Sequence, residues 1–406
     1  METVDEQPAN PGAGRELVID GRSIASVDGE PTRITIRAGR IASIARGSGA
    51  AARRWIGPGW LDIQVNGFDG HDPNSVGAEP ATTAALIRAL WRFGVSGACV
   101  TICTESEAHI LHALEAVAAA CNDDPLIAAS VVGIHVEGPH IATEDGPRGA
   151  HPLRHVRPPS IAEYRRWQAA AGGRIRIITL SPEYEGAAAY IEAIVADGVV
   201  ASIGHTAANS DQIRRAVDAG ATWSTHLGNG AHAMIRRHPN YIWDQLAEDR
   251  LSAGFIFDGQ HLPPAVMKSF IRAKGVERSI LVSDALFVAG LAPGVYQLPD
   301  GAPVELAKSG RLELQGTPYL AGAAAPLPVS IGNAVRHAGV SFVDAIRMVT
   351  TNPSQLLGLP AEAGHDHLLV GAVANLTEFR IAPNGFDVDV ARTIVAGQVV
   401  HASDAG

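Results

Sequence analysis

Residues 175–205, IRIITLSPEYEGAAAYIEAIVADGVVASIGH, contain a complete strand–helix–strand unit. The apolar runs IRIITL and VVASI flank the Ala-rich stretch EGAAAYIEAIVADG, which has the composition of a helix. Strands that are apolar along their whole length and are separated by a helix are typical of a parallel sheet covered by helices. The stretch therefore predicts an α/β architecture.

The same pattern repeats on both sides of this unit. The expected strands are WLDIQVN (60–66), GACVTIC (97–103), VVGIHVEG (131–138), IRIITLSPE (175–183), VVASIGH (199–205), TWSTHLGN (222–229), SAGFIFDG (252–259) and SILVSDA (279–285). Eight strands that alternate with helices favour a (β/α)₈ TIM-like barrel over an open doubly wound sheet. No GxGxxG turn follows a strand and no GxxxxGK[ST] motif occurs, so the Rossmann and P-loop folds lose their main support.

The two ends of the chain differ from this middle. Residues 16–48 and the segments AVANLTEFR, FDVDVARTIV and GQVVHA near the C-terminus show short alternating runs with glycine between them, a pattern of β-hairpins. We expect one small β-sandwich domain built from residues 1–56 and 365–406, beside a barrel of residues 57–364. We also expect a β excursion over residues 293–316, after the eighth barrel strand.

Composition excludes several classes of protein. Hydrophobic residues make up 46% of the 406 residues and charged residues 18%, which excludes a wholly disordered chain. The net charge of −10 argues against nucleic acid or an anionic membrane as a partner. Three cysteines form a poor disulfide framework, the first residues do not resemble a signal peptide, and no run reaches the roughly 18 apolar residues of a membrane helix. These features predict a cytoplasmic protein.

Polar side chains end most of the expected strands, and in a barrel the chemistry gathers at the C-terminal strand ends. They are Gln64 and Asn66 on the first strand, Glu137 on the third, His205 on the fifth, His226 on the sixth, Asp258 with His261 on the seventh, and Asp284 on the eighth. A single histidine of this kind is more often a satisfied core or loop residue. Coincidence at several strand ends favours a functional site.

Glu137, His205 and His226 form a set of one carboxylate and two imidazoles, which suits Zn²⁺ or another divalent transition metal. Three protein ligands leave a position for water, whose pKa the metal lowers. Asp284 could accept the proton of that water and pass it to a leaving group. The alternative for Asp284 is a helix cap, but its place after the apolar run ILVS favours the catalytic role.

Seven motifs that follow one another along the chain extend this reading. They are GPGWLDIQVNG, GIHVEGP followed by GAH, SIGHT, STHLGNG, DGQHL, LVSDA and YLAG. Together they resemble the N-acetylglucosamine-6-phosphate deacetylase family of the amidohydrolase superfamily, from about Gly57 to about Leu359. The resemblance implies one divalent metal, Zn or else Fe, Co or Mn, held by Glu137, His205 and His226, with Asp284 as acid and base. Many amidohydrolases carry His-x-His on the first strand, whereas this chain has Gln64-Val65-Asn66, so a second metal is not expected.

The resemblance also implies a substrate, N-acetylglucosamine 6-phosphate, from which the acetyl group is removed as acetate. His151 is implied to polarise the acetamide carbonyl and Arg237 to reach the phosphate bound in a neighbouring subunit, which requires at least a homodimer. The further substrate contacts that it implies are at Ala150, Asn229, Gly230, His261, Leu320 and Gly322. The alternative for Arg236 and Arg237 is a solvated pair of loop charges.

Some positions depart from the family pattern. Gly228 stands where a bulky aromatic residue is usual, and His140 and His232 add imidazoles near the expected substrate mouth. These departures keep open a related hydrolase that acts on another N-acyl or cyclic amide. A non-catalytic paralogue would have lost metal or acid–base residues, and none is lost. Cys99 and Cys103 are expected to be core residues.

Overall fold

The computed structural model describes residues 16–25, 29–48, 53–298, 301–316 and 320–403. Eight parallel strands form one sheet in sequential order. They are β5 (Trp60–Val65), β6 (Val95–Cys103), β7 (Val131–Glu137), β8 (Ile175–Leu180), β9 (Val200–Ile203), β10 (Trp223–Ser224), β11 (Ser252–Phe255) and β12 (Ser279–Leu281). The backbone N–H of Asp284, just after β12, donates to the Gln64 carbonyl on β5 at 2.9 Å. This contact brings the first and last strands together, and the predicted barrel is confirmed as nearly closed.

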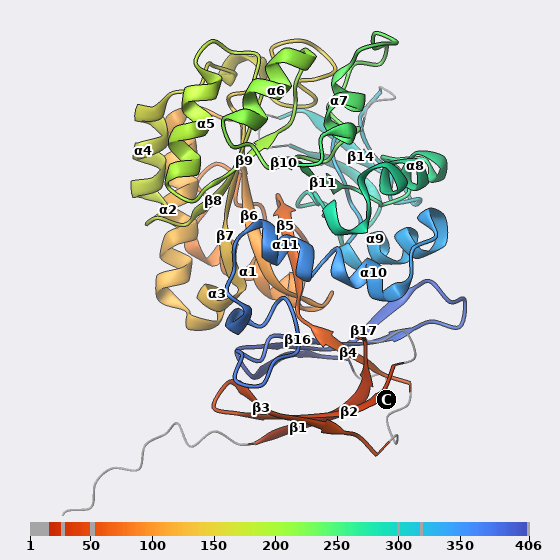
Figure 1. Cartoon of the computed structure of the whole chain (residues 1–406). Coiled ribbons are helices and arrows are strands. Elements are labelled where there is room, and N and C mark those ends of the chain that lie inside the picture. The colour runs from red at the N-terminus through yellow and green to blue at the C-terminus, as the bar shows by residue number, and fades with distance from the viewer. Residues whose placement is uncertain (1–15, 26–28, 49–52, 299–300, 317–319, 404–406) are drawn as a thin grey trace, which may run out of the picture.

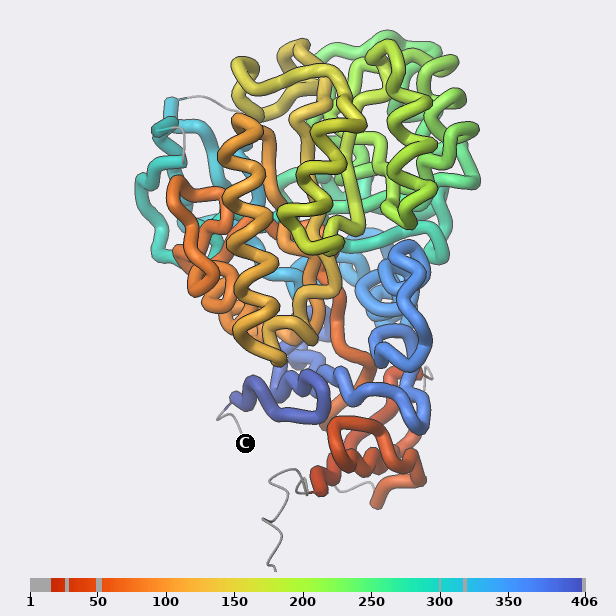
Figure 2. The backbone as a smooth tube through the Cα atoms, turned by 90° about the vertical axis from the view of Figure 1, so that its left-hand side faces the viewer, coloured from red at the N-terminus to blue at the C-terminus, as the bar shows by residue number. Residues whose placement is uncertain are grey.

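Helices surround the barrel in both views (Figures 1 and 2). They are α1 (Pro80–Trp91), α2 (Glu107–Asp123), α3 (Pro125–Ser130), α4 (Ile161–Ala170), α5 (Ala187–Ala196), α6 (Ser210–Asp218), α7 (Tyr241–Ala247), α8 (Pro264–Lys274), α9 (Leu327–Asn333), α10 (Phe342–Arg347) and α11 (Thr351–Leu356). Short 3₁₀ turns cover Leu153–His155, Val276–Arg278 and Ala361–Ala363, and a π-helical turn covers Ala334–Ala338. In the described part of the chain, no helix combines the length and the apolar character needed to cross a bilayer.

Segments from both ends of the chain form a second sheet of seven strands, in the order β18-β17-β16-β4-β1-β2-β3. They are β1 (Leu17–Ser23), β2 (Pro31–Arg37), β3 (Arg40–Arg46), β4 (Trp55–Pro58), β16 (Leu376–Ile381), β17 (Val388–Val395) and β18 (Gln398–Ala402). Isoleucines of the N-terminal strands share one apolar cluster with Leu376 and Ile394. Figure 1 shows β1–β3 lying beneath β16 and β4, so the sheet folds over that cluster as a sandwich.

The small sheet lies at the end of the barrel where the strands begin, because β4 leads into β5 after one residue. The C-terminal strand ends are thereby left to the connecting loops. The division at residues 56/57 and 364/365 stays a prediction, since β4 runs across the first of these boundaries. Residues 1–15, assigned to the small domain, lie outside the described residues.

A three-stranded antiparallel sheet follows β12, and it confirms the expected β excursion. It consists of β13 (Gly294–Gln297), β14 (Pro303–Leu306) and β15 (Leu312–Leu314). Val304, Leu306 and Leu312 pack in one apolar cluster with Val288 and Ala321. The excursion thus has its own small core, and that core attaches it to the segment after β12.

Candidate metal centre and substrate pocket

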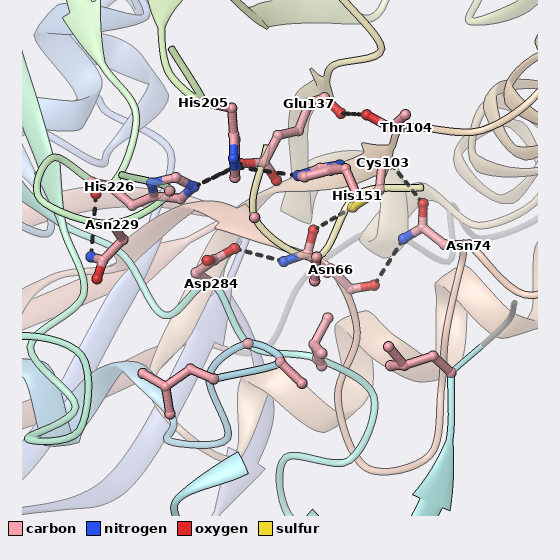
Figure 3. A pocket seen from close by; sticks show the side chains of 18 of the residues that line it. Asn66, Asn74, Cys103, Thr104, Glu137, His151, His205, His226, Asn229 and Asp284 are labelled. Atoms are coloured by element: carbon pink, nitrogen blue, oxygen red, sulfur yellow. Dashed lines mark hydrogen bonds and ion pairs between the residues drawn. The ribbon is translucent and has the colours of Figure 1, made fainter. Parts of the chain in front are cut away.

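Three buried side chains converge at the C-terminal ends of neighbouring strands (Figure 3). Glu137 is the last residue of β7, and His205 and His226 each lie two residues beyond β9 and β10. The Nε2 atoms of the two histidines are 3.0 Å apart. Glu137 Oε1 lies 3.0 Å from His226 Nε2 and 3.3 Å from His205 Nε2. The predicted carboxylate and two imidazoles therefore face a common point.

The chemistry of this set fits a divalent cation. The His205 Nδ1–H donates to the Pro147 carbonyl at 2.9 Å, so Nε2 carries the lone pair that faces the cluster. Burial opposes the charge on Glu137, but the adjacent imidazoles of His205 and His226 outweigh it and hold the pKa of Glu137 well below its usual range. The three ligand atoms lie within 4.8 Å of one another. Within the described ranges no other group of His, Cys, Asp and Glu side chains meets that condition.

The backbone at this site adopts a costly conformation. His205, His226 and Asp284 have φ angles of +51°, +28° and +48°, in the region that residues with a Cβ avoid. Such strain persists where the surrounding fold over-determines it, and it clusters at functional sites. The tertiary structure therefore imposes the direction in which these three side chains leave their strands.

Asp284 stands beside the cluster and faces the two amides of β5. Asp284 Oδ1 accepts hydrogen bonds from Asn66 Nδ2 at 2.7 Å and from Gln64 Nε2 at 3.1 Å. Burial, followed by the nearby charge of Glu137, raises the pKa of Asp284 to about 7. A carboxyl group with that pKa can accept and return a proton near neutral pH. Among the described residues, the next helix after Asp284 is α9, so the helix-cap alternative is wrong.

His151 completes the cluster from the loop before the Leu153–His155 turn. His151 Nε2 lies 3.2 Å from His205 Nε2. Burial lowers the pKa of His151 to about 3, so the imidazole is neutral at physiological pH. A neutral imidazole at this place can donate one N–H to a substrate oxygen.

A pocket of about 290 Å³ opens onto the cluster. It brings together all the predicted site residues except Arg237: Glu137, Ala150, His151, His205, His226, Asn229, Gly230, His261, Asp284, Leu320 and Gly322. Its apolar wall includes Leu286, Phe287 and Leu298, from the segment after β12 and the loop after β13. Arg237 lies on an exposed loop and is not among the residues that line this pocket.

Some lining residues were not found by the sequence reasoning, and one expectation is wrong. Asn74, Thr104 and His109 line the pocket beside Cys103, which was expected in the core. Cys99 is fully buried as expected, whereas the Cys103 Sγ–H donates to Asn66 Oδ1 at 3.0 Å. Cys103 is the last residue of β6, so its place at a strand end was the signal.

The departures from the family pattern lie outside the pocket lining, contrary to expectation. His140 stacks on Trp167 with ring centroids 5.3 Å apart. His232 lies 3.0 Å from both the Tyr241 hydroxyl and Glu144 Oε2. A Cβ at Gly228 would meet the Phe270 ring at 2.8 Å, so packing explains the missing side chain. These positions give no support to an altered substrate.

The fold and the site together define a metal-dependent barrel hydrolase of the amidohydrolase superfamily. No protein-family model matches the chain. It is 30% identical over 348 residues to N-acetylglucosamine-6-phosphate deacetylase of Bacillus subtilis, covering 85% of this chain and 84% of the relative. It is 31% identical over 302 residues to N-acetylgalactosamine-6-phosphate deacetylase of Shewanella sp., covering 74% of each. The chain belongs to the N-acetylglucosamine-6-phosphate deacetylase family.

A solved structure agrees over nearly the whole chain. It is that of N-acetyl-D-glucosamine-6-phosphate deacetylase from Mycobacterium smegmatis in complex with N-acetyl-D-glucosamine-6-phosphate. The TM-score is 0.83 and the sequence identity 28%, with 95% of this chain and 100% of that chain covered. The likeness includes the small sheet as well as the barrel, because so little of either chain is left out.

Proposed function

We propose that the protein removes the acetyl group from an N-acetylated amino sugar, N-acetylglucosamine 6-phosphate, and releases acetate. One observation carries the proposal: Asp284 and His151 flank the convergent Glu137, His205 and His226 in a single pocket. This arrangement offers a metal site, a neutral N–H donor and a proton acceptor side by side. The relatives named above support the substrate.

The roles follow from the contacts. Glu137, His205 and His226 would hold one divalent ion, Zn or else Fe, Co or Mn, which supplies Lewis acidity and lowers the pKa of a water molecule. His151 donates its N–H to the acetamide carbonyl oxygen, where negative charge develops. Asp284 takes a proton from the water, whose oxygen adds to the carbonyl carbon. When the C–N bond breaks, Asp284 returns that proton to the amine and acetate leaves.

A phosphate on the substrate favours a cationic side chain close to it. Among the described residues, neither lysine nor arginine lines the pocket. Arg237 lies on an exposed loop beside Met234, which is 92% exposed, and α7 nearby exposes 53% of Trp243. In the proposal, the protein forms a homodimer in which Arg237 of a second copy meets the phosphate. Three free cysteines support the proposed cytoplasmic location.

The substrate test compares acetate release from four compounds: the 6-phosphates of N-acetylglucosamine and N-acetylgalactosamine, unphosphorylated N-acetylglucosamine, and an N-acetyl amino acid. We expect the largest kcat/KM for N-acetylglucosamine 6-phosphate. A larger value for the galactosamine epimer would move the proposal to that sugar, as the Shewanella relative suggests. Hydrolysis of the amino acid alone, by a metal-loaded preparation, would refute an amino-sugar substrate.

A further inference from the structure

The segment of β5 next to Asp284 is held by a network that the proposed mechanism does not use. Asn66 is buried, and its Nδ2 donates to Asp284 Oδ1 at 2.7 Å while its Oδ1 accepts the Cys103 thiol at 3.0 Å. Figure 3 shows these three side chains in a row along one side of the pocket. The amide of Asn66 therefore links Cys103 to Asp284 by hydrogen bonds.

Both partners of the thiol contact have fixed backbones. Asn74 Oδ1 accepts the Cys103 backbone N–H at 2.8 Å. Asn74 Nδ2 donates to the Asn66 carbonyl at 3.2 Å and to the Thr101 carbonyl at 3.0 Å. Asn74 thus joins the ends of β5 and β6, and the Cys103 thiol is held at Asn66.

In this orientation of the Asn66 amide, its Oδ1 needs a hydrogen-bond donor. The Asp284 carboxylate can only accept, so Asn66 must turn Nδ2 toward it and Oδ1 away from it. The thiol is the side-chain donor that meets Oδ1. Without the Cys103 thiol, the buried Oδ1 of Asn66 would lose this hydrogen bond. The terminal torsion of an asparagine is soft enough for the amide then to turn.

The orientation of Asn66 decides which oxygen of Asp284 can act. Both amide donors, from Gln64 and Asn66, reach Oδ1. In the part of the chain that the structure describes, no hydrogen-bond donor reaches Oδ2, so that oxygen is left for proton transfer. If Asn66 turned, its Oδ1 would repel the carboxylate and Asp284 would lose this orientation.

We propose that Cys103 is a positioning residue that holds Asn66, and through Asn66 holds Asp284 in the orientation for proton transfer. This inference rests on the proposed function, in which Asp284 moves the proton. The wild-type protein is therefore assayed first with N-acetylglucosamine 6-phosphate. Absence of turnover there would count against the function, whereas an effect confined to the variants concerns Cys103.

The test uses Cys103→Val, which replaces the thiol with a slightly larger apolar group and removes the donor, and Cys103→Ser, which keeps a donor. Cys103→Val should lower kcat about three- to tenfold, the effect of one lost hydrogen bond, with unchanged KM and metal content. Cys103→Ser should stay closer to wild type. Cys121→Val, on the outer helix α2, is the matched control and should leave kcat unchanged. Full activity of Cys103→Val, or a Cys103→Ser as slow as it, would overturn the inference.

A double-mutant cycle tests the path of the effect. If Cys103 acts only through Asn66, Cys103→Val should not lower kcat further in an Asn66→Ala background. An equal loss in both backgrounds would show that Cys103 affects the pocket by another route, and would refute the positioning role. Equal unfolding midpoints for wild type and Cys103→Val would separate the kinetic effect from general destabilisation.

Discussion

At the scale of single residues, the two carboxylates of the site differ in charge because their surroundings differ. Two imidazoles lie beside Glu137 and hold its pKa well below the usual range. Asp284 accepts hydrogen bonds from two neutral amides. Its burial and the nearby charge of Glu137 raise its pKa to about 7. Environments that separate the pKa values of two carboxyl groups assign them different roles. Glu137 suits a permanent ligand and Asp284 suits a proton carrier.

Asp284→Asn tests the second role. Asparagine has nearly the same shape but does not take up a proton at neutral pH, so kcat should fall about 10²- to 10⁴-fold. Metal content and the affinity for a non-hydrolysed substrate analogue should change little. Steady-state kinetics, metal analysis and calorimetric titration check the three parts. A kcat close to that of the wild type would exclude Asp284 as the acid and base.

Metal removal tests the role of Glu137 as a metal ligand. Dialysis against a chelator should abolish acetate release, and adding Zn²⁺, Fe²⁺, Co²⁺ or Mn²⁺ should restore it with about one equivalent bound per chain. Glu137→Gln replaces the anionic ligand with an amide, a poor ligand for these metals, and should lower metal content. Two equivalents per chain, both required for turnover, would contradict the single site.

At the scale of elements, the loop after β10 depends on a glycine that makes room for a metal ligand. Gly230 has a φ of +56°, and a Cβ there would lie 2.7 Å from His205 Nδ1. That nitrogen already donates to the Pro147 carbonyl at 2.9 Å. The loop and the imidazole are therefore packed too closely for any side chain at this position.

Gly230→Ala should displace His205 and weaken metal binding, measured as metal retained after dialysis and as kcat. Gly198→Ala is the matched control, because its φ of +78° carries the same backbone strain while nothing lies within 4 Å of the added carbon. Both variants should lose about 1–2 kcal/mol of stability from strain. Only Gly230→Ala should lose metal. Equal metal content in the two variants would contradict the packing argument.

At the scale of the whole molecule, the proposed assembly and the substrate charge are linked. Arg237→Ala should raise KM for N-acetylglucosamine 6-phosphate about tenfold or more, since a charge-assisted contact contributes about 1.5–3 kcal/mol. KM for the unphosphorylated sugar should hardly change. Arg236→Ala removes the neighbouring exposed charge and serves as the control.

Sedimentation or light scattering should find at least a dimer, of which a two-fold pair is the commonest form. An equal rise in KM for both substrates in Arg237→Ala would refute the proposed phosphate contact. A fully active monomer would remove the assembly from the proposal. Either result would leave the metal centre and the proton carrier untouched.

The sequence alone predicted the barrel and the metal set because both follow from local pattern. A strand covered by helices on a parallel sheet, such as Ile175–Leu180, is mostly apolar and mostly buried, and its apolar residues can be recognised in the sequence. The ends of parallel strands meet at one mouth, so Glu137, His205 and His226 could be placed together without coordinates. Cys103 escaped because the same apolar run contains a core cysteine and a pocket cysteine. The two cysteines differ in position, because Cys103 is the last residue of the strand and Cys99 is not.

The tertiary structure decided what depends on contacts between distant segments. It turned His205, His226 and Asp284 inward through positive φ angles, it placed Asn66 between Cys103 and Asp284, and it kept His140 and His232 out of the pocket lining. Side-chain direction, hydrogen-bond partners and pKa values depend on neighbours that are remote in sequence. Periodicity and motif order, in contrast, predict the fold and the residue types of the site, because the burial pattern and the strand direction follow from the order of residues along the chain.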